Sequence, residues 1–287
     1  MIKISCVKET PFDYAKHSSI GCGGSAIGAY YPKSVEEIES LVGALLGAKK
    51  PFITLGNLTN VLPPDGESQT SVVSTKLLTG IERTDCGVFA LAGVTSGALL
   101  KACKAWNLSG AEFLAGIPCT LGGALYMNAG VSGEYIAEIT ESVTVLRGGK
   151  LVVLDVADCG YAYKSSVFMR SNDVIVGAHL RLQRENQENI SEKLQKYHVK
   201  RAHLPKGKSM GCVFKNPTGA LAGKLIEGAG LKGLRVGGAV VSEIHANFII
   251  NDKNATATQI KTLIGLIKNA VFAQYKIRLE EEIRYLP

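Results

Sequence analysis

The chain has 287 residues, of which 46% are hydrophobic and 20% charged, and this composition is that of an ordinary globular protein. Its length predicts two or three domains of roughly 100–150 residues each. No apolar run approaches the ~20 residues that a membrane span needs, and the N-terminus lacks the apolar core of a signal peptide, so we expect a cytoplasmic protein without a membrane partner.

The net charge of +7 indicates which partners to expect, and the seven cysteines indicate whether disulfides or a metal site are present. The positive charge is spread along the chain, and its densest stretch, Lys193–Lys208, is typical of a charged helix and loop, so we predict no nucleic-acid partner. The cysteines are odd in number and no two form a C-x-x-C pair, which argues against a disulfide framework and against a metal site. A phosphorylated small molecule remains compatible with the basic charge.

Hydrophobic patterning near the N-terminus predicts a β-α-β unit. A strand over 29–32 precedes Ser34, and Glu37 three residues later completes a capping box for a helix over 35–48. A buried strand over 51–55 follows. The remaining elements predicted by the pattern, in chain order, are strands over 72–75 and 88–94, a helix over 96–106 capped by Thr95, strands over 142–146, 151–156 and 174–182, a helix over 189–203, a helix over 221–229, strands over 235–241 and 247–250, a helix over 258–275 and a strand over 277–285.

The order of these elements indicates the fold class. Strands and helices mixed in this way favour an α+β protein over one doubly wound sheet. The Gly-Gly pair within 147–150 suits a tight hairpin turn between two of the strands. The charged helix over 189–203 is the predicted junction between an N-terminal and a C-terminal part.

Glycines gather in several segments, and the first of these is not a dinucleotide fingerprint. Gly21–Ala26 fits G-x-G-x-x-A, but no hydrophobic strand precedes it and no helix follows it directly. Three other segments, Leu55–Asn60, Ala92–Gly97 and Gly116–Ala124, follow strands or lie in loops, where bare backbone N–H groups can hold a pyrophosphate. Together with Met127–Gly130, they favour a ligand over simple turns.

Uncommon motifs follow one another along the rest of the chain. They are the run from Gly116, GIPCTLGGALYMNAGVSGEYIAE, then Tyr163–Phe168, Gly211–Pro217 with the following AGKLIEGAGLKG and HANFIIN, and Leu279–Arg284. In this order they resemble the flavin-binding signature, the Y-R-x-S-x-F and G-S-x-F-K-N-P regions and the L-E-x-E-V-R strand of the UDP-N-acetylenolpyruvoylglucosamine reductases. The resemblance covers nearly the whole chain.

This resemblance implies a fold and a reaction. The fold would be a two-lobed FAD-binding region of the vanillyl-alcohol-oxidase (PCMH) type, with lobes over 1–80 and 81–188, and an α+β substrate-binding domain over 189–287. Non-covalent FAD and NADPH would reduce UDP-N-acetylglucosamine enolpyruvate to UDP-N-acetylmuramate, a precursor of the bacterial cell wall. The short spacing between the Tyr163 and Gly211 motifs implies the compact branch without an extra loop over the substrate, and a monomer is favoured.

The resemblance also assigns site residues. Lys164, Cys212 and Glu282 would converge on the enolpyruvyl group, with Cys212 in the place of the family's serine proton donor. Tyr163, Lys215, Asn216 and Lys224 would bind the substrate. The residues that would bind the cofactor are Gly56, Asn57, Leu58, Thr59, Asn60, Gly93, Gly116, Ile117, Pro118, Cys119, Thr120, Gly122, Gly123, Ala124, Asn128, Ala129 and Gly130.

The chain departs from the family pattern at four of these positions. Cys212 keeps a proton donor, because a thiol with a pKa of ~8.5 is mostly protonated at neutral pH. Lys164 replaces an arginine and keeps the charge without the planar fork. Leu58 and Cys119 replace glycines, which would lower FAD affinity if those positions need positive φ. Two alternatives therefore stay open, a family member that binds flavin or UDP-sugar without catalysis and another FAD oxidoreductase of the same fold.

Overall fold

The computed structural model describes residues 6–287, which divide into two compact units that alternate along the chain. Unit 1 contains 28–57 and 70–202 with the described residues up to Glu9, and unit 2 contains 10–27, 58–69 and 203–287. Helices and mixed strands occur throughout, which confirms the α+β class. The functional division into 1–80, 81–188 and 189–287 stays a prediction, and its residues 1–5 lie outside the described part of the chain.

The first sheet of unit 1 contains the elements of the predicted β-α-β unit. Its strands run in the order β1 (Val7–Glu9), β3 (Ser25–Tyr31), β6 (Glu67–Ser74) and β4 (Phe52–Leu55). β4 pairs with β6 in parallel, so β6 lies between the two strands of the predicted unit. The helix α2 (Val35–Gly47) begins where the capping motif predicts, and Ser34 Oγ accepts the Glu37 N–H at 3.2 Å. The Glu37 carboxylate accepts from the Lys33 N–H instead.

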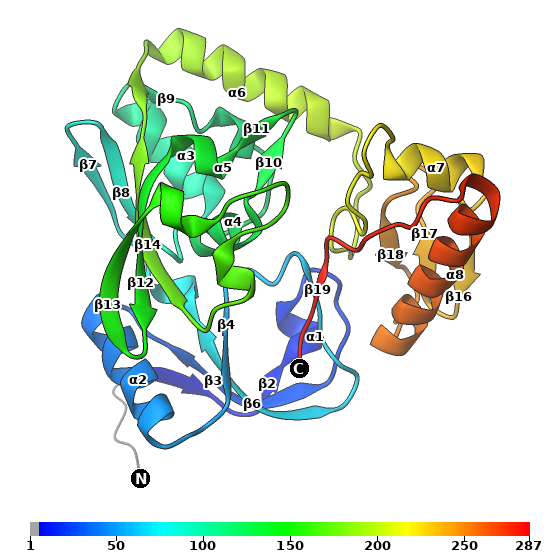
Figure 1. Cartoon of the computed structure of the whole chain (residues 1–287), viewed down its shortest axis with the longest axis horizontal. Helices are drawn as coiled ribbons and strands as arrows, with labels where there is room; N and C mark the ends of the chain where they lie inside the picture. Colours follow the sequence, from blue (N-terminus) through cyan, green and yellow to red (C-terminus); the bar gives the residue numbers. More distant parts are fainter. Residues whose placement is uncertain (1–5) are drawn as a thin grey trace. The chain divides into compact units, whose positions relative to one another are not determined.

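The second sheet of unit 1 is antiparallel throughout. Its order is β13 (Lys150–Asp155), β12 (Thr140–Arg147), β14 (Val174–Arg181), β8 (Gly87–Leu91) and β7 (Ile81–Thr84), side by side in Figure 1. The predicted hairpin is confirmed, because Arg147 pairs with Lys150 across Gly148 and Gly149, which have φ of 59° and 82°. Such values are those of a two-residue hairpin turn.

Helices cover this sheet and carry two of the glycine segments. Thr95 caps α3 (Ser96–Ala105) by accepting the Ala98 N–H at 3.2 Å, as predicted. The short helix α4 (Leu121–Met127) contacts β14 and β8, and α6 (Gln187–Ala202) contacts α3 (Figure 1). Buried side chains of α2, α3, α4 and the sheet form one hydrophobic core in unit 1.

Unit 2 has its own hydrophobic core. A three-stranded antiparallel sheet, β16 (Arg235–Val236), β17 (Ala239–Val241) and β18 (Ile249–Asn251), packs with α7 (Ala222–Gly228) and α8 (Ala257–Tyr275). The buried residues of α8 recur at helical spacing, as expected for one apolar face, and they are Ile260, Leu263, Ile264, Ile267 and Val271. Within residues 6–287, none of the helices combines the length and the apolar character that a bilayer crossing requires.

Two predicted strands of this unit differ from the structure. The segment 235–241 is a hairpin, because Gly237 has φ of 55° and a Cβ at Gly238 would lie 2.3 Å from the Lys253 carbonyl oxygen. The segment 277–285 is a strand only at β19 (Arg284–Tyr285), which pairs with β5 (Val61–Leu62). Just before β19 the chain changes partner, since Glu281 forms an isolated bridge with Phe214. One continuous ladder is therefore not formed.

A carboxylate from another part of the chain reinforces the start of α8. Asp65 Oδ1 accepts the Ala257 N–H at 2.6 Å, and its Oδ2 accepts the N–H and the hydroxyl of Thr258 at 2.8 and 2.7 Å. Burial alone would raise the pKa of Asp65, but the hydrogen bonds from Thr258 and Ala257 and the charge of Lys261 lower the pKa below its ordinary value.

We predict that Asp65→Ala lowers the free energy of unfolding of unit 2 by about 1 kcal/mol at pH 7, the typical value of a lost helix cap. Because the pKa of Asp65 is lowered in the folded state, this stabilisation is present above the unfolded-state pKa of ~3.9 and is lost as pH falls through the folded-state value. Urea unfolding of both proteins at pH 7 and at pH 3 measures it. A difference that did not shrink in acid would contradict the assignment.

Candidate active site

The two later glycine segments predicted to bind a pyrophosphate, and the part of the first up to Asn57, meet within unit 1. Thr95 and Thr120 form a β-bridge, and the Ser96 N–H donates to the Cys119 carbonyl at 3.1 Å, which joins the second segment to the third. Asn57 Nδ2 donates to the Pro118 carbonyl at 3.3 Å, which joins the first segment to the third. Sequence positions that lie far apart thus form one glycine-rich surface.

Close packing of these loops explains two of the glycines. A Cβ at Gly56 would lie 2.2 Å from Thr120 Oγ1, and one at Gly93 would lie 1.9 Å from the Thr75 carbonyl oxygen. Real Cβ atoms do not approach so closely, so a larger residue at either place would push the segments apart. These two glycines are required by the protein's own loop packing before any ligand is considered.

The backbone amides of the third segment are partly used within the protein. The Leu121 N–H donates to the Val94 carbonyl and the Gly122 N–H to the Ala92 carbonyl, both at 2.8 Å. Thr120 caps α4 by accepting the Gly123 N–H at 3.4 Å. The N–H groups of Leu121 and Gly122 therefore link the third segment to the second, and the Gly123 N–H is capped within its own segment. Contacts of Gly122 and Gly123 with a cofactor stay a prediction.

The two positions where larger residues replace family glycines behave differently. Leu58 has φ of 51°, in the left-handed region that disfavours side chains, and its side chain is buried. Cys119 is not among the described residues with positive φ, so its backbone accommodates a side chain without this cost. The Cys119 thiol is buried, and burial raises its pKa to about 11, which keeps it protonated and unreactive.

Lys164 lies beside the glycine-rich surface in unit 1. Its Nζ donates to the Gly130 carbonyl at 3.4 Å. Asn128, the left-handed C-cap of α4, is buried and donates through Nδ2 to the Ala162 carbonyl at 2.9 Å while accepting the Ala137 N–H. The Asn128 carboxamide thus fixes the loop that carries Tyr163 and Lys164, and its contact with a cofactor stays a prediction.

Cys212 and Glu282 lie on neighbouring segments of unit 2. The Glu282 N–H donates to the Val213 carbonyl at 2.8 Å, and Phe214 bridges Glu281. Both Cys212 and Glu282 are half-buried. Backbone pairing therefore brings together the two segments that carry these residues of the predicted catalytic set, which are far apart in the sequence.

Asn60 belongs to the same cluster as Glu282. Its Nδ2 donates to the Glu282 carbonyl at 3.1 Å, and its own carbonyl accepts the Arg284 N–H at 2.9 Å. The loop containing Leu58, Thr59 and Asn60 is part of unit 2, whereas Gly56 and Asn57 are part of unit 1. The first predicted pyrophosphate loop therefore divides between the two units.

The residues predicted to bind the substrate lie on exposed or half-buried surface. Tyr163 is exposed and packs edge-on against Tyr135, with ring centroids 6.3 Å apart. Lys215 forms an ion pair of 2.5 Å with Glu280. Asn216 Oδ1 accepts the Ala222 N–H at 3.0 Å and so caps the start of α7, and Lys224 is exposed on that helix.

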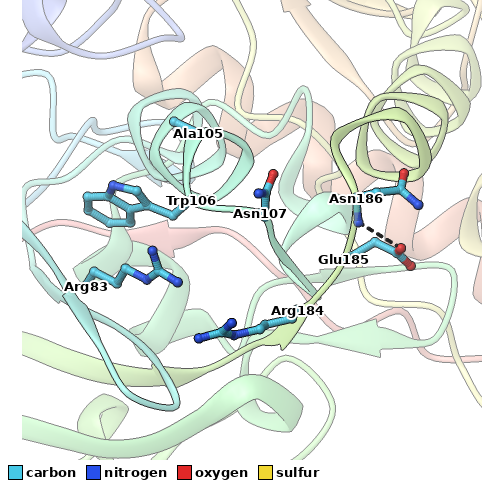
Figure 2. Close-up of a pocket in the computed structure, with 7 residues that line it drawn as sticks. All are labelled: Arg83, Ala105, Trp106, Asn107, Arg184, Glu185 and Asn186. Carbon is cyan, nitrogen blue, oxygen red and sulfur yellow. Dashed lines mark hydrogen bonds between the residues drawn. The ribbon is translucent and has the colours of Figure 1, made fainter.

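A separate polar hollow of about 470 Å³ lies at the other end of α3 (Figure 2). It is lined by Arg83, Ala105, Trp106, Asn107, Arg184, Glu185 and Asn186. The Glu185 carboxylate is already engaged, by the Asn186 N–H, Asn189 Nδ2 and Lys193 Nζ. The glycine segment Ala92–Gly97 opens the N-terminal end of α3, so the hollow is distinct from the glycine-rich surface.

The chain matches two protein-family models and known relatives over most of its length. Residues 26–155 match the model of an FAD binding domain, and residues 202–286 match the C-terminal domain of UDP-N-acetylenolpyruvoylglucosamine reductase. The reductase of Lactiplantibacillus plantarum is 36% identical over 267 residues, covering 92% of this chain and 88% of that protein. The reductase of Borrelia garinii subsp. bavariensis is 38% identical, covering 89% and 85%.

Solved structures show the same likeness. The crystal structure of UDP-N-acetylenolpyruvylglucosamine reductase from Thermus caldophilus matches with a TM-score of 0.85 and 30% identity, covering 98% of this chain and all of that one. A BBE-like 1 variant from Physcomitrella patens shares the fold alone, at 14% identity and a TM-score of 0.50 over 63% of this chain. These matches extend over nearly the whole chain, and the chain belongs to the UDP-N-acetylenolpyruvoylglucosamine reductases.

Proposed function

We infer that the protein reduces the enolpyruvyl group of UDP-N-acetylglucosamine enolpyruvate to give UDP-N-acetylmuramate, with NADPH as the electron donor and FAD as the bound cofactor. The observation that carries this inference is that one chain combines the converging glycine segments with the Cys212–Glu282 pair, in a family match over most of its length. We propose that it works in the cytoplasm as a monomer, in the synthesis of peptidoglycan precursors.

The glycine-rich surface of unit 1 fits the FAD. Gly56, Gly93 and Gly116 have no side chain, Gly116 has φ of 75°, and Asn57, Ile117 and Pro118 adjoin these glycines in the chain. We propose that these residues hold the cofactor, joined by Ala129, Gly130 and the Leu58–Asn60 loop. When bound, FAD supplies the transfer of a hydride from NADPH to the substrate.

We propose that Cys212 delivers the proton that completes the reduction. Addition of a hydride to an enol ether beside a carboxylate leaves negative charge on an enolate, which must be stabilised and then protonated. A thiol of ordinary pKa, ~8.5, is protonated at neutral pH and is a stronger acid than a serine hydroxyl. The Cys212 Sγ–H bond would break as the new C–H bond forms, and the thiolate would then regain a proton from water.

Lys164 and Glu282 complete the proposed catalytic set. A lysine provides a positive charge for the substrate carboxylate or the enolate, although without the bidentate fork of arginine. Glu282 is placed by the same backbone pairing that fixes the Cys212 segment, and we propose that it polarises the enolate region or shares a proton with it. Tyr163, Lys215, Asn216 and Lys224 would contact the sugar nucleotide.

The purified protein is expected to be yellow, with the absorbance of oxidised flavin. Under anaerobic conditions NADPH should bleach this colour, and UDP-N-acetylglucosamine enolpyruvate should restore it. A stopped-flow spectrophotometer measures both half-reactions, with UDP-N-acetylglucosamine as the control ligand. A colourless protein would point to a non-catalytic family member, and a yellow protein that ignores the enolpyruvyl substrate would point to a different oxidoreductase.

For Cys212→Ala we predict at least a 100-fold loss of kcat with substrate binding retained, because only proton delivery loses its group. Cys212→Ser should keep more activity than Cys212→Ala, since a hydroxyl also donates a proton. Steady-state kinetics and substrate titration of the flavin spectrum measure the two effects separately. Unchanged turnover in Cys212→Ala would remove the thiol from the mechanism.

Replacing Lys164 tests the role of its charge. Lys164→Met should lower kcat/KM by roughly 10–100-fold, because a hydrogen bond to a charged group contributes about 1.5–3 kcal/mol. Lys164→Arg should retain activity, since it keeps the charge and adds the fork. The flavin content of each variant serves as the control for folding of unit 1. Equal activity of Lys164→Met and the parent protein would contradict this role.

A further inference from the structure

The segment that carries Cys212 is the middle member of three short, irregularly paired segments in unit 2. On one side, Cys212 bridges Phe248, and the Val213 N–H donates to the Asn247 carbonyl at 2.8 Å. On the other side, the Val213 carbonyl accepts the Glu282 N–H at 2.8 Å, and the Lys215 N–H donates to the Glu280 carbonyl at 2.9 Å. The backbone of Val213 is therefore hydrogen-bonded on both sides.

Asn247 uses its side chain to replace the missing backbone partner of Phe214. Its Oδ1 accepts the Phe214 N–H at 2.9 Å, and its Nδ2 donates to the Phe214 carbonyl at 2.8 Å. Asn247 is 3% exposed, and Phe214 is 1% exposed. A carboxamide is suited to this place because it offers an acceptor and a donor side by side, and buried backbone groups need both.

This arrangement connects one buried residue to both members of the proposed catalytic pair. Asn247 holds the backbone at Val213 and Phe214, next to Cys212. The same Val213 holds Glu282, and Phe214 bridges Glu281. Loosening the Asn247 side chain would leave both backbone groups of Phe214 without a partner, and the segment would be free to shift relative to both neighbours.

We propose that Asn247 is a positioning residue, which sets the placement of Cys212 and Glu282 through its two hydrogen bonds to Phe214. The proposal rests on the roles proposed for Cys212 and Glu282. The two side-chain hydrogen bonds of Asn247 to Phe214 act on the backbone of this segment, so their loss should slow proton delivery without affecting the reduction of the flavin by NADPH. A shift of about 1 Å in catalytic geometry costs as much as 100-fold in rate.

A second buried asparagine, at the end of β18, provides a matched control. Asn251 is 5% exposed, donates through Nδ2 to the Ile20 and Gly21 carbonyls at 2.8 and 3.1 Å, and accepts the Ala255 N–H at 2.7 Å. Its carboxamide thus makes the same kind of backbone contacts as that of Asn247. None of these contacts is to the segment that carries Cys212.

The experiment compares Asn247→Asp with Asn251→Asp. A second comparison, Asn247→Ser with Asn251→Ser, is used if the aspartate variants do not fold. Each protein is purified with its FAD, and four quantities are measured: the unfolding midpoint, the rate of flavin reduction by NADPH, the rate of reoxidation by the enolpyruvyl substrate, and the rate of Cys212 alkylation by iodoacetamide, read by peptide mass.

For the Asn247 variants we expect reoxidation to slow by about 30- to 100-fold, with flavin reduction within about twofold of the parent protein and a changed rate of Cys212 alkylation. The solvent deuterium isotope effect on reoxidation should rise, because proton delivery becomes limiting. The Asn251 variants should lose similar stability while keeping both half-reactions and the alkylation rate near those of the parent protein.

Two results would overturn the proposal and would be distinguishable from a failure of the proposed function. If both asparagine positions slowed reoxidation in proportion to their loss of stability, Asn247 would be a structural residue only. If Cys212→Ala abolished turnover but the Asn247 variants reoxidised at the parent rate, the catalytic role of Cys212 would stand and the positioning role of Asn247 would fall. Full turnover in Cys212→Ala would instead remove the thiol from the mechanism, and a parent protein whose reduced flavin ignores the enolpyruvyl substrate would reject the proposed function itself.

Discussion

The hydrogen bond from the Glu282 N–H to the Val213 carbonyl is the interaction on which the proposed chemistry depends. It pairs the last segment of the chain with the segment after Gly211, and neither segment is part of a regular sheet. A regular sheet would distribute the register over many bonds. Here the placement of Cys212 and Glu282 depends on a few backbone bonds, and the side chains of Asn60 and Asn247 supply others.

In unit 1, close packing of loops from different parts of the chain depends on glycine residues and on side-chain hydrogen bonds. Its glycine segments must approach each other closely enough to form one surface, and Gly56 and Gly93 permit that approach because a Cβ would meet Thr120 or Thr75. Glycine-rich loops destabilise the folded state, because glycine loses more conformational entropy on folding than other residues do. Caps at Thr95 and Thr120 and the amide of Asn128 offset this cost by tying each loop to a helix end or to a neighbouring loop.

The departures from the family pattern have separate physical consequences. Cys119 replaces a glycine in a backbone conformation that tolerates a side chain, and its buried thiol stays protonated with a pKa of about 11. Leu58 has a left-handed backbone conformation, in which a glycine would be less strained. Burial of the Leu58 side chain offsets part of this strain. In the proposed catalytic set, Lys164 retains the positive charge of the family's arginine and Cys212 retains a proton donor.

Local sequence signals determined the helices and their starts at Ser34 and Thr95, the hairpin at Gly148–Gly149, the glycine segments and, through the family motifs, the cofactor and the reaction. These depend on short-range periodicity, capping and turn chemistry, which a single chain displays in order. Only the tertiary structure decided that Arg235–Val241 folds back as a hairpin, that the two units alternate along the chain, and that Asn247 and Asn60 bond to the Cys212 and Glu282 segments. Such pairings join residues far apart in the sequence, and their hydrogen-bonding partners are fixed by the packing of whole elements, which no local pattern encodes.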